Sequence, residues 1–148
     1  MPDRKTVKRA KRDQAEGKAP STQAGEFVRE EMDHIREGKH GARSAKQAIA
    51  IGLSKARRAG VKLPAPKTGT KATKKSAARD ARKGASPKRK AVSKTRSRAT
   101  KTALKKEGSA AASPRALSRH AKASARRRGP AKRSAAAKKA ARTRAAKK

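Results

Sequence analysis

Residues 44–60 read SAKQAIAIGLSKARRAG, and they carry the clearest helix signal in the chain. Ser44 and Gln47 form a capping box, in which the two side chains satisfy amide groups that a helix leaves unpaired at its start. Three basic residues fall in the last turns, where the helix dipole favours cations. Gly60 then ends the periodic pattern. The sequence therefore predicts a helix that begins after Ser44 and ends before Gly60.

A second amphipathic segment precedes this helix. Residues 21–38 are predicted to form a helix that Ser21 or Thr22 caps and Gly38 ends. The two helices should form a hairpin over about residues 21–60. Their predicted packing residues are Val28, Met32 and Ile35 in the first helix, and Ile49, Leu53 and Ala56 in the second. Because so small a hairpin buries few side chains, we expect it to form a homodimer or to fold against a partner.

Four acidic residues of the first helix fall on the face opposite its apolar residues, namely Glu26, Glu30, Asp33 and Glu37. A stripe of this kind is typical of a helix face in contact with solvent. The alternative is that the stripe holds part of the basic tail when no nucleic acid is bound.

Charge is spread unevenly along the chain. The 148 residues include 46 Lys or Arg and 10 Asp or Glu, a formal net charge of +36, but residues 67–148 alone hold 30 of the basic residues and 2 of the acidic ones. Low hydrophobicity with high net charge is typical of intrinsic disorder. We therefore expect a mostly disordered chain with a small all-α element. Its parts are a basic N-terminal arm (1–20), the helical hairpin (21–63) and a disordered, low-complexity tail rich in Lys, Arg and Ala (64–148).

Composition argues against several classes of function. The chain has no Cys, which excludes disulfides, thiolate nucleophiles and cysteine zinc sites. No stretch approaches the roughly 18 apolar residues of a membrane span, and no apolar run of a signal peptide follows the N-terminal basic residues. No nucleophile–base constellation or P-loop occurs, so we expect neither enzyme activity nor a cofactor.

The tail is expected to bind polyanions through its charge. Its net charge of +28 matches about 14 base pairs of duplex at one negative charge per roughly 1.7 Å. We expect the free tail to be mostly coil because neighbouring like charges repel, and to become helical on DNA. The candidate nucleic-acid contacts in the tail are Lys88, Arg89, Lys90, Arg115, Arg126, Arg127, Arg128, Lys132, Arg133, Lys138, Lys139, Arg142 and Arg144. Those in the hairpin are Lys39, Arg43, Arg57 and Arg58.

Two local features could refine this binding. Ser86-Pro87-Lys88-Arg89 resembles the SPKK-type elements of linker-histone tails, which are associated with the narrow minor groove of A·T-rich DNA; chance composition is the alternative. The segment 37–44 places Lys39, His40 and Arg43 before a helix N-terminus, which is suited to a phosphate, although it also reads as a simple interhelical turn. His34 and His40 lack a Cys partner, and no metal site is expected.

The stretch KQAIAIGLSKARRAG (46–60), with STQAGEFVREEMDHIREGKHGARS (21–44) before it, resembles an uncharacterised family of small basic bacterial and phage-associated proteins. This resemblance implies a bacterial source and no particular activity. The tail is similar in composition to linker-histone tails and to the Lys/Ala/Pro-rich histone-like proteins of bacteria.

The leading hypothesis is a histone-like, nucleoid-associated protein of the bacterial cytoplasm that binds double-stranded DNA without sequence specificity and compacts or bridges it. An RNA-associated basic protein, of the ribosome or RNA-chaperone type, is the alternative. RNA and single-strand readers usually stack bases on aromatic side chains, and Phe27 is the only aromatic residue. A third hypothesis is an adaptor whose hairpin binds a protein while the tail localises it. No membrane association is expected.

Overall fold

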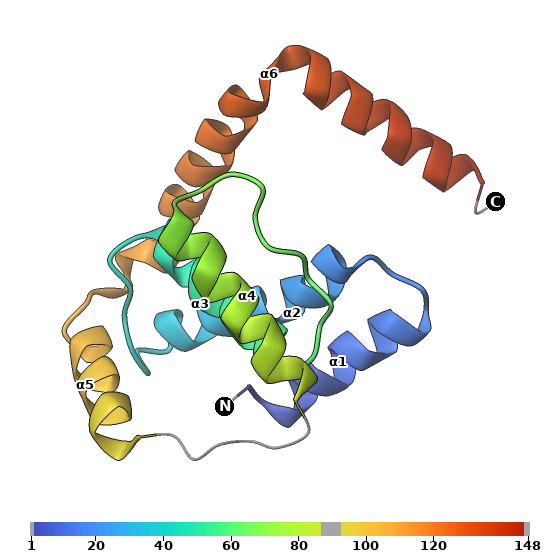
Figure 1. The fold of residues 1–148 in the computed structure, drawn as a ribbon. Coiled ribbons are helices and arrows are strands. Elements are labelled where there is room, and N and C mark those ends of the chain that lie inside the picture. The colour runs from blue at the N-terminus through green and yellow to red at the C-terminus, as the bar shows by residue number, and fades with distance from the viewer. Residues whose placement is uncertain (1, 87–92, 147–148) are drawn as a thin grey trace. The chain divides into compact units, whose positions relative to one another are not determined.

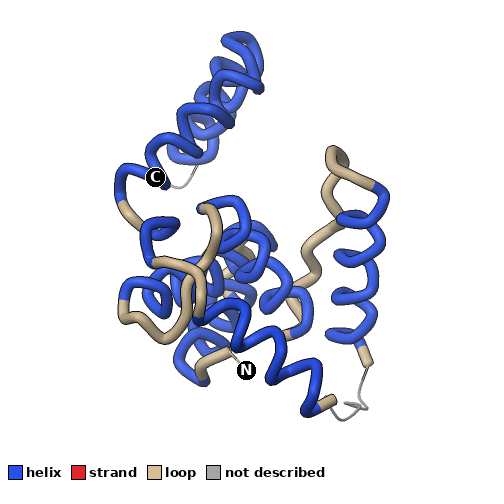
Figure 2. The backbone as a smooth tube through the Cα atoms, turned by 90° about the vertical axis from the view of Figure 1, so that its left-hand side faces the viewer, coloured by secondary structure: helices blue, strands red, loops and turns tan. Residues whose placement is uncertain are grey.

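The computed structural model describes residues 2–86 and 93–146, and their regular secondary structure is helical throughout (Figure 2). The elements are α1 (Arg4–Ala15), α2 (Pro20–Arg36), α3 (Ala45–Arg58), α4 (Lys71–Ala85), α5 (Lys94–Lys105), the 3-10 helix η1 (Ser109–Ala112) and α6 (Pro114–Ala145). The expectation of a mostly disordered chain with a disordered, low-complexity tail is therefore wrong, because helices cover most of the predicted tail.

The chain divides into two compact units, Met1–Ser113 and Pro114–Lys148. In the first unit, α1 packs on α2, α2 on α3, and α3 on α4 (Figure 1). The predicted boundaries near residues 20 and 63 thus fall inside one unit. Among the described residues, no helix combines the length and the apolar composition that crossing a membrane requires.

The helix predicted from residues 44–60 is confirmed at both ends. The Ser44 hydroxyl accepts a hydrogen bond from the Gln47 amide at 3.2 Å, and the Gln47 side chain accepts one from the Arg43 amide at 2.9 Å. Ala59 is the C-cap and Gly60 follows with a φ of 96°. The helix before it begins earlier than predicted, with Pro20 in its first turn and no side-chain cap, because the fixed φ of proline is already suited to a helix start.

Helices α2 and α3 cross with their backbones in close contact. A Cβ atom at Gly52 would lie 2.7 Å from the Val28 Cα atom, so this position accepts only glycine without a shift of backbone. The buried face of α3 accordingly consists of small residues together with an arginine: Ala45, Ala48, Gly52, Ala56 and Arg57. Of the predicted packing residues, Met32, Ile35 and Ala56 are buried, whereas Val28, Ile49 and Leu53 are half-buried.

Helices α1 and α4 cover the hairpin from within the same chain. Ala10 of α1 joins Phe27 and Ala56 in a buried cluster, and Leu63 packs against it. Asp80 of α4 accepts hydrogen bonds from the Ser54 hydroxyl of α3 at 2.6 Å and from the Arg58 guanidinium at 2.9 Å. The argument that the hairpin needs a second copy or a partner to bury its faces therefore no longer holds.

The tail is helical because caps and alanine outweigh charge repulsion. Thr70 caps α4 by accepting a hydrogen bond from the Thr73 amide, and Ser93 caps α5 through the Arg96 amide. Like-charge pairs on a helix cost only about 0.2–0.5 kcal/mol each, and a run of alanines offsets several of them since alanine is the best helix former. The expectation that the free tail is coil is wrong because it overestimated charge repulsion relative to the helix propensity of alanine.

Helix α6 is interrupted at one point. Gly129 has φ 73° and ψ 165°, a conformation that is essentially open only to glycine, and Pro130 follows without an amide to donate. The 32 residues of α6 are therefore two helical segments joined at this break. The break can be followed in the ribbon of Figure 1.

Candidate nucleic-acid interface

All ten acidic residues lie within ion-pair distance of a basic side chain. Nine of them pair with Lys or Arg, and the tenth, Asp3, lies 3.5 Å from the His34 ring. Since only ten acidic residues face 46 basic ones, this pairing leaves most cations without a counter-charge. The first unit thus neutralises its own carboxylates and leaves cations to solvent or to a ligand.

The predicted acidic stripe of α2 is part of this internal pairing. Glu30 is 4% exposed, and its carboxylate contacts Lys55 Nζ at 3.4 Å. Glu26 pairs with Arg9 of α1. The expectation of a solvent-exposed face is wrong for Glu30, and neither partner comes from the tail. The stripe holds α1 and α3 against α2.

Two of the predicted contacts in the hairpin form ion pairs next to the loop that joins α2 and α3. Lys39 Nζ lies 2.8 Å from the Glu37 carboxylate, and Arg43 lies 3.5 Å from Glu107. The hydrogen bond from Lys39 lowers the pKa of Glu37, and the same bond raises the pKa of Lys39. A phosphate would have to compete with these carboxylates.

The other two predicted contacts in the hairpin hold the end of α3. Arg57 is 7% exposed and donates hydrogen bonds to the carbonyl oxygens of Leu63 and Pro64, so its guanidinium is not presented to a phosphate. Arg58 pairs with Asp80. Burial raises the pKa of Asp80, but the hydrogen bonds from Ser54 and Arg58 outweigh it, and the pKa lies below its usual range.

The segment 37–44 acts as a structural turn. The amide of Gly41 donates to the carbonyl of Leu104 at 2.9 Å, and the amide of Ala42 donates to Gly108 at 3.2 Å. A Cβ atom at Gly41 would lie 1.8 Å from the Glu107 carbonyl oxygen. Two amides of this segment therefore already bind the end of α5 and the residues after it, which favours the turn over the phosphate site.

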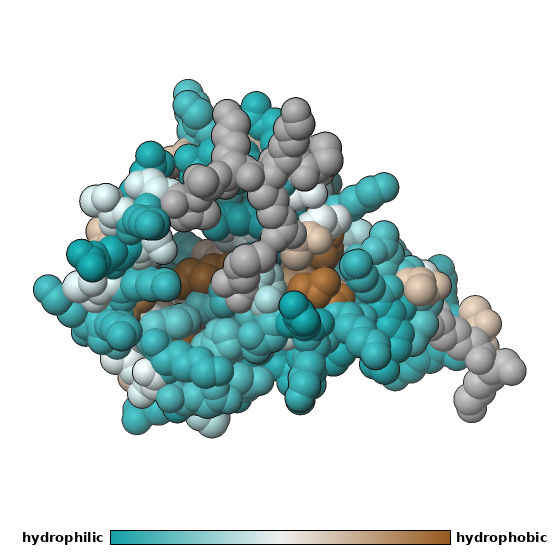
Figure 3. Space-filling model, turned by 90° about the horizontal axis from the view of Figure 1, so that it is seen from below, coloured by the Kyte–Doolittle hydropathy of each residue, from teal (hydrophilic) through white to brown (hydrophobic). Residues whose placement is uncertain are grey.

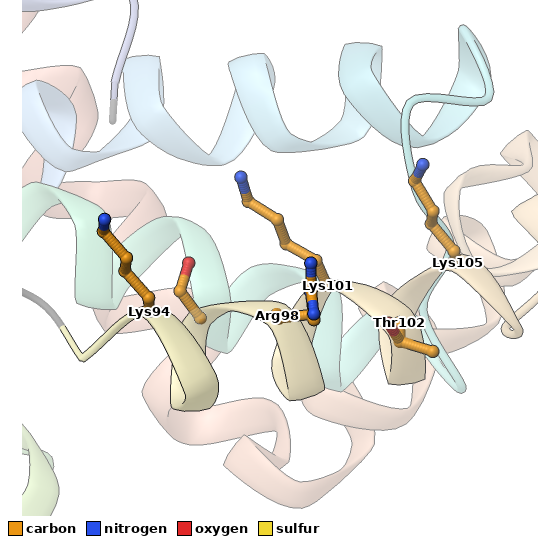
Figure 4. A pocket seen from close by; sticks show the side chains of 6 residues that line it. Lys94, Arg98, Lys101, Thr102 and Lys105 are labelled. Carbon is orange, nitrogen blue, oxygen red and sulfur yellow. The ribbon is translucent and has the colours of Figure 1, made fainter.

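A stripe of cations runs along one side of α5, and we call it the α5 stripe. It consists of Lys94, Arg98, Lys101 and Lys105, which border a shallow hollow of about 450 Å³ with Ser97 and Thr102. Their spacing of i, i+4, i+7 and i+11 places them within about 60° of one another on a helix. Figure 4 shows Lys94, Lys101 and Lys105 extending to the same side of the helix. No acidic side chain lines this hollow among the described residues.

Helix α6 carries a second stripe with the same spacing. This α6 stripe consists of Arg115, Arg119, Lys122 and Arg126, and all four are exposed. The remaining predicted contacts on α6 are also exposed, namely Arg127, Arg128, Lys132, Arg133, Lys138, Lys139, Arg142 and Arg144. Helix α6 holds no acidic residue. Lys88, Arg89 and Lys90, and with them most of the Ser86–Arg89 motif, lie outside the described residues.

Sequence reasoning missed the α5 stripe as well as Arg119 and Lys122. The signal was present, since both stripes repeat cations at i, i+4, i+7 and i+11. Reading the tail as coil removed the reason to look for a helical period. The face of the molecule seen in Figure 3 is mostly hydrophilic and shows hydrophobic residues only in restricted patches.

One group of side chains, which was not expected from the sequence to bind a metal, has the composition of a metal site. Glu31, His34 and His40 each offer a ligand atom, and these atoms lie within 4.8 Å of one another. Glu31 Oε1 lies 3.3 Å from His40 Nε2. Asp3 and Glu30 form a similar group with His34.

Comparison with known proteins bears on the hairpin alone. No curated protein and no solved structure matches the chain. Residues 20–68, which contain α2, α3 and the segment that follows them, are similar to a family described as a family of unknown function (DUF6496). This match agrees with the expected resemblance to an uncharacterised family and supplies no activity for the candidate interface.

Proposed function

We propose that this protein binds double-stranded DNA through the phosphate backbone, with little sequence preference, and compacts or bridges DNA as a nucleoid-associated protein of the bacterial cytoplasm. The observation that carries the proposal is the internal pairing of the acidic residues, which leaves the α5 and α6 stripes unopposed. Unopposed cations release the counterions condensed on DNA, and this release drives sequence-independent binding.

The dimensions of both stripes suit a duplex. A helix with its side chains is about 10–12 Å across, and the major groove of B-DNA is about 12 Å wide. Each stripe spans eleven residue steps, or about 16 Å of helix axis. Its cations are therefore spaced about 4.5–6 Å apart along one side of the helix, where they can contact successive phosphates of one groove wall.

The single aromatic residue favours DNA over RNA as the ligand. Phe27 is 1% exposed and packs in the core, so it is not available to stack on a base. Sequence-specific RNA readers and single-strand binders depend on such stacking. What remains is contact with phosphates, which positions a protein without reading bases.

Bridging follows from the presence of two separate stripes. The α5 stripe belongs to the first compact unit and the α6 stripe to the second. A chain with two phosphate-binding surfaces can hold two duplexes, or two segments of one duplex, without forming an oligomer.

Fluorescence anisotropy with the full chain tests the proposal. Labelled duplex DNA, single-stranded DNA and structured RNA of equal length would be titrated at several salt concentrations between about 50 and 200 mM. We expect duplex DNA to bind with a steep negative slope of log K against log salt and with similar affinity for unrelated sequences. Tighter binding to structured RNA than to duplex would favour the RNA alternative. Affinity independent of salt would refute phosphate binding.

A further inference from the structure

The interior of the first unit contains a charged cluster that the proposed function does not use. Glu31 is 0% exposed, and its carboxylate lies between Lys55 Nζ at 2.6 Å and His40 Nε2 at 3.3 Å. The rings of His34 and His40 lie 6.3 Å apart at an interplanar angle of 81°. Neither oxygen of Glu31 accepts a hydrogen bond of good geometry. Oε2 nevertheless forms an ion pair with Lys55 Nζ. Oε1 is therefore a buried acceptor without a donor.

The tautomer of His40 follows from its other contact. His40 Nδ1 lies 3.1 Å from the carbonyl oxygen of Gly41, and because a carbonyl can only accept, a hydrogen bond between these atoms places a proton on Nδ1. In the neutral ring, Nε2 then holds a lone pair, and this lone pair faces the orphan Oε1 of Glu31. Two acceptors facing each other in a buried place require either a proton or a metal cation between them. A ring N–H that donates to a backbone carbonyl is also the usual support of a metal-ligating histidine.

The charges around the cluster do not balance. The buried carboxylates Glu30 and Glu31 share one ammonium group, that of Lys55. Asp3 adds a third carboxylate, which is 60% exposed and lies 3.5 Å from His34. The described ion pairs thus leave one to two negative charges uncompensated, and buried charges are normally paired or bound to metal. A divalent cation on two neutral histidines supplies the missing charge.

We propose that Glu31, His34 and His40 bind a divalent transition-metal ion such as Zn²⁺. Two imidazole nitrogens and one carboxylate oxygen form a ligand set that Zn²⁺ accepts, with bonds of about 2.0–2.2 Å. The three ligand atoms now lie within 4.8 Å of one another, so side-chain shifts of under about 1 Å bring them to such distances. Lys55 remains on Oε2 and leaves Oε1 for the metal.

The site has an entry path and a structural consequence. His34 also lines a surface hollow of about 150 Å³ together with Asp3 and Glu30, which gives an ion a route from solvent. His40 belongs to the turn whose next residue, Gly41, hydrogen-bonds to Leu104 at the end of α5. A bound metal therefore fixes this turn to α2 and, through it, the C-terminal end of α5.

Metal titration of the untagged full chain tests the site. The protein would be purified without a histidine tag, freed of nucleic acid and treated with a chelator before Co²⁺ is added. We expect saturable visible d–d absorption at one Co²⁺ per chain, displaced by Zn²⁺, and a higher melting temperature with Zn²⁺. His40→Ala and Glu31→Gln should each weaken binding by more than about tenfold. His120→Ala is the matched control, since His120 lies on α6, and should bind as the wild type does.

NMR of the imidazole rings in the wild-type chain tests the site without any variant, so the result does not depend on whether a variant folds. On addition of Zn²⁺, the ring signals of His34 and His40 should shift while those of His120 stay in place. The proposal is overturned if no saturable Co²⁺ absorption develops, or if His40→Ala and His120→Ala behave alike. It is equally overturned if the ring signals of His34 and His40 ignore Zn²⁺, because protons then supply the missing charge.

Discussion

Neutralising the α5 stripe is the sharpest perturbation of DNA binding that the structure offers. The variant replaces Lys94, Arg98, Lys101 and Lys105 by Gln, which keeps an unbranched polar side chain of similar helix propensity while removing its charge. These side chains are exposed and form no ion pair in the described part of the chain. The fold should therefore survive, and circular dichroism of the variant would verify this.

The expected effect follows from counterion release. Each phosphate contact contributes about 0.9 to the slope of log K against log salt, so losing four contacts should reduce the magnitude of the slope by about 3.6. Between about 50 and 200 mM salt, the ratio of wild-type to variant affinity should then fall about 150-fold. Anisotropy titrations with one labelled duplex at four or five salt concentrations measure both quantities.

A control variant removes the same charge elsewhere in the first unit. Arg4, Lys5, Lys8 and Lys11 are exposed cations of α1, and this helix lies against α2, where Glu26 and Glu30 already oppose positive charge. Changing these four residues to Gln should alter the slope by less than about one. If the two variants lose equal slope, or if the α5 variant keeps the wild-type slope, the α5 stripe is not a phosphate-binding surface and the reasoning fails.

Three further predictions concern the fold. Asp80→Asn should lower the free energy of unfolding by about 2 kcal/mol, measured by urea titration, because it weakens the charged hydrogen bond with Arg58. The pKa of Asp80 lies below its usual range, so the stabilisation by its carboxylate is complete above about pH 4 and is lost as the pH falls through the pKa of the folded state. The stabilities of wild type and variant should therefore converge in acid and differ at neutral pH. Gly52→Ala should cost about 1–3 kcal/mol, seen as a lower urea midpoint, since its Cβ would meet Val28, and an unchanged midpoint would contradict the close crossing of α2 and α3. The full chain should give a strongly helical far-ultraviolet spectrum without DNA, whereas a coil spectrum that becomes helical only on adding duplex would contradict the fold.

What the sequence could predict was set by local chemistry. The start of α3 followed from Ser44 and Gln47, because a capping box involves only neighbouring residues. The start of α2 was misplaced since a proline and two candidate caps compete within three positions, and the sequence alone does not rank them.

What the sequence could not predict depended on long-range pairing. Asp80 looks like a stray acid in a cationic segment, yet it anchors α4 to Arg58, 22 residues away. Glu30 and Glu31 fall on different faces of a helical wheel, and nothing local shows that both converge on Lys55. Arg43 and Arg58 were proposed as phosphate contacts for the same reason, because their carboxylate partners Glu107 and Asp80 are distant in the sequence.

The interruption at Gly129 gives the second unit a shape that a duplex can use. An unbroken helix of 32 residues would be a straight rod about 48 Å long. The groove of a duplex winds around the DNA axis, so a straight rod of that length leaves the groove within one turn. Two shorter rods joined at a bend can each settle where the groove turns. Because the bend belongs to a backbone conformation that other residues avoid, it is part of the folded chain, and DNA binding of the kind proposed above would not have to create it.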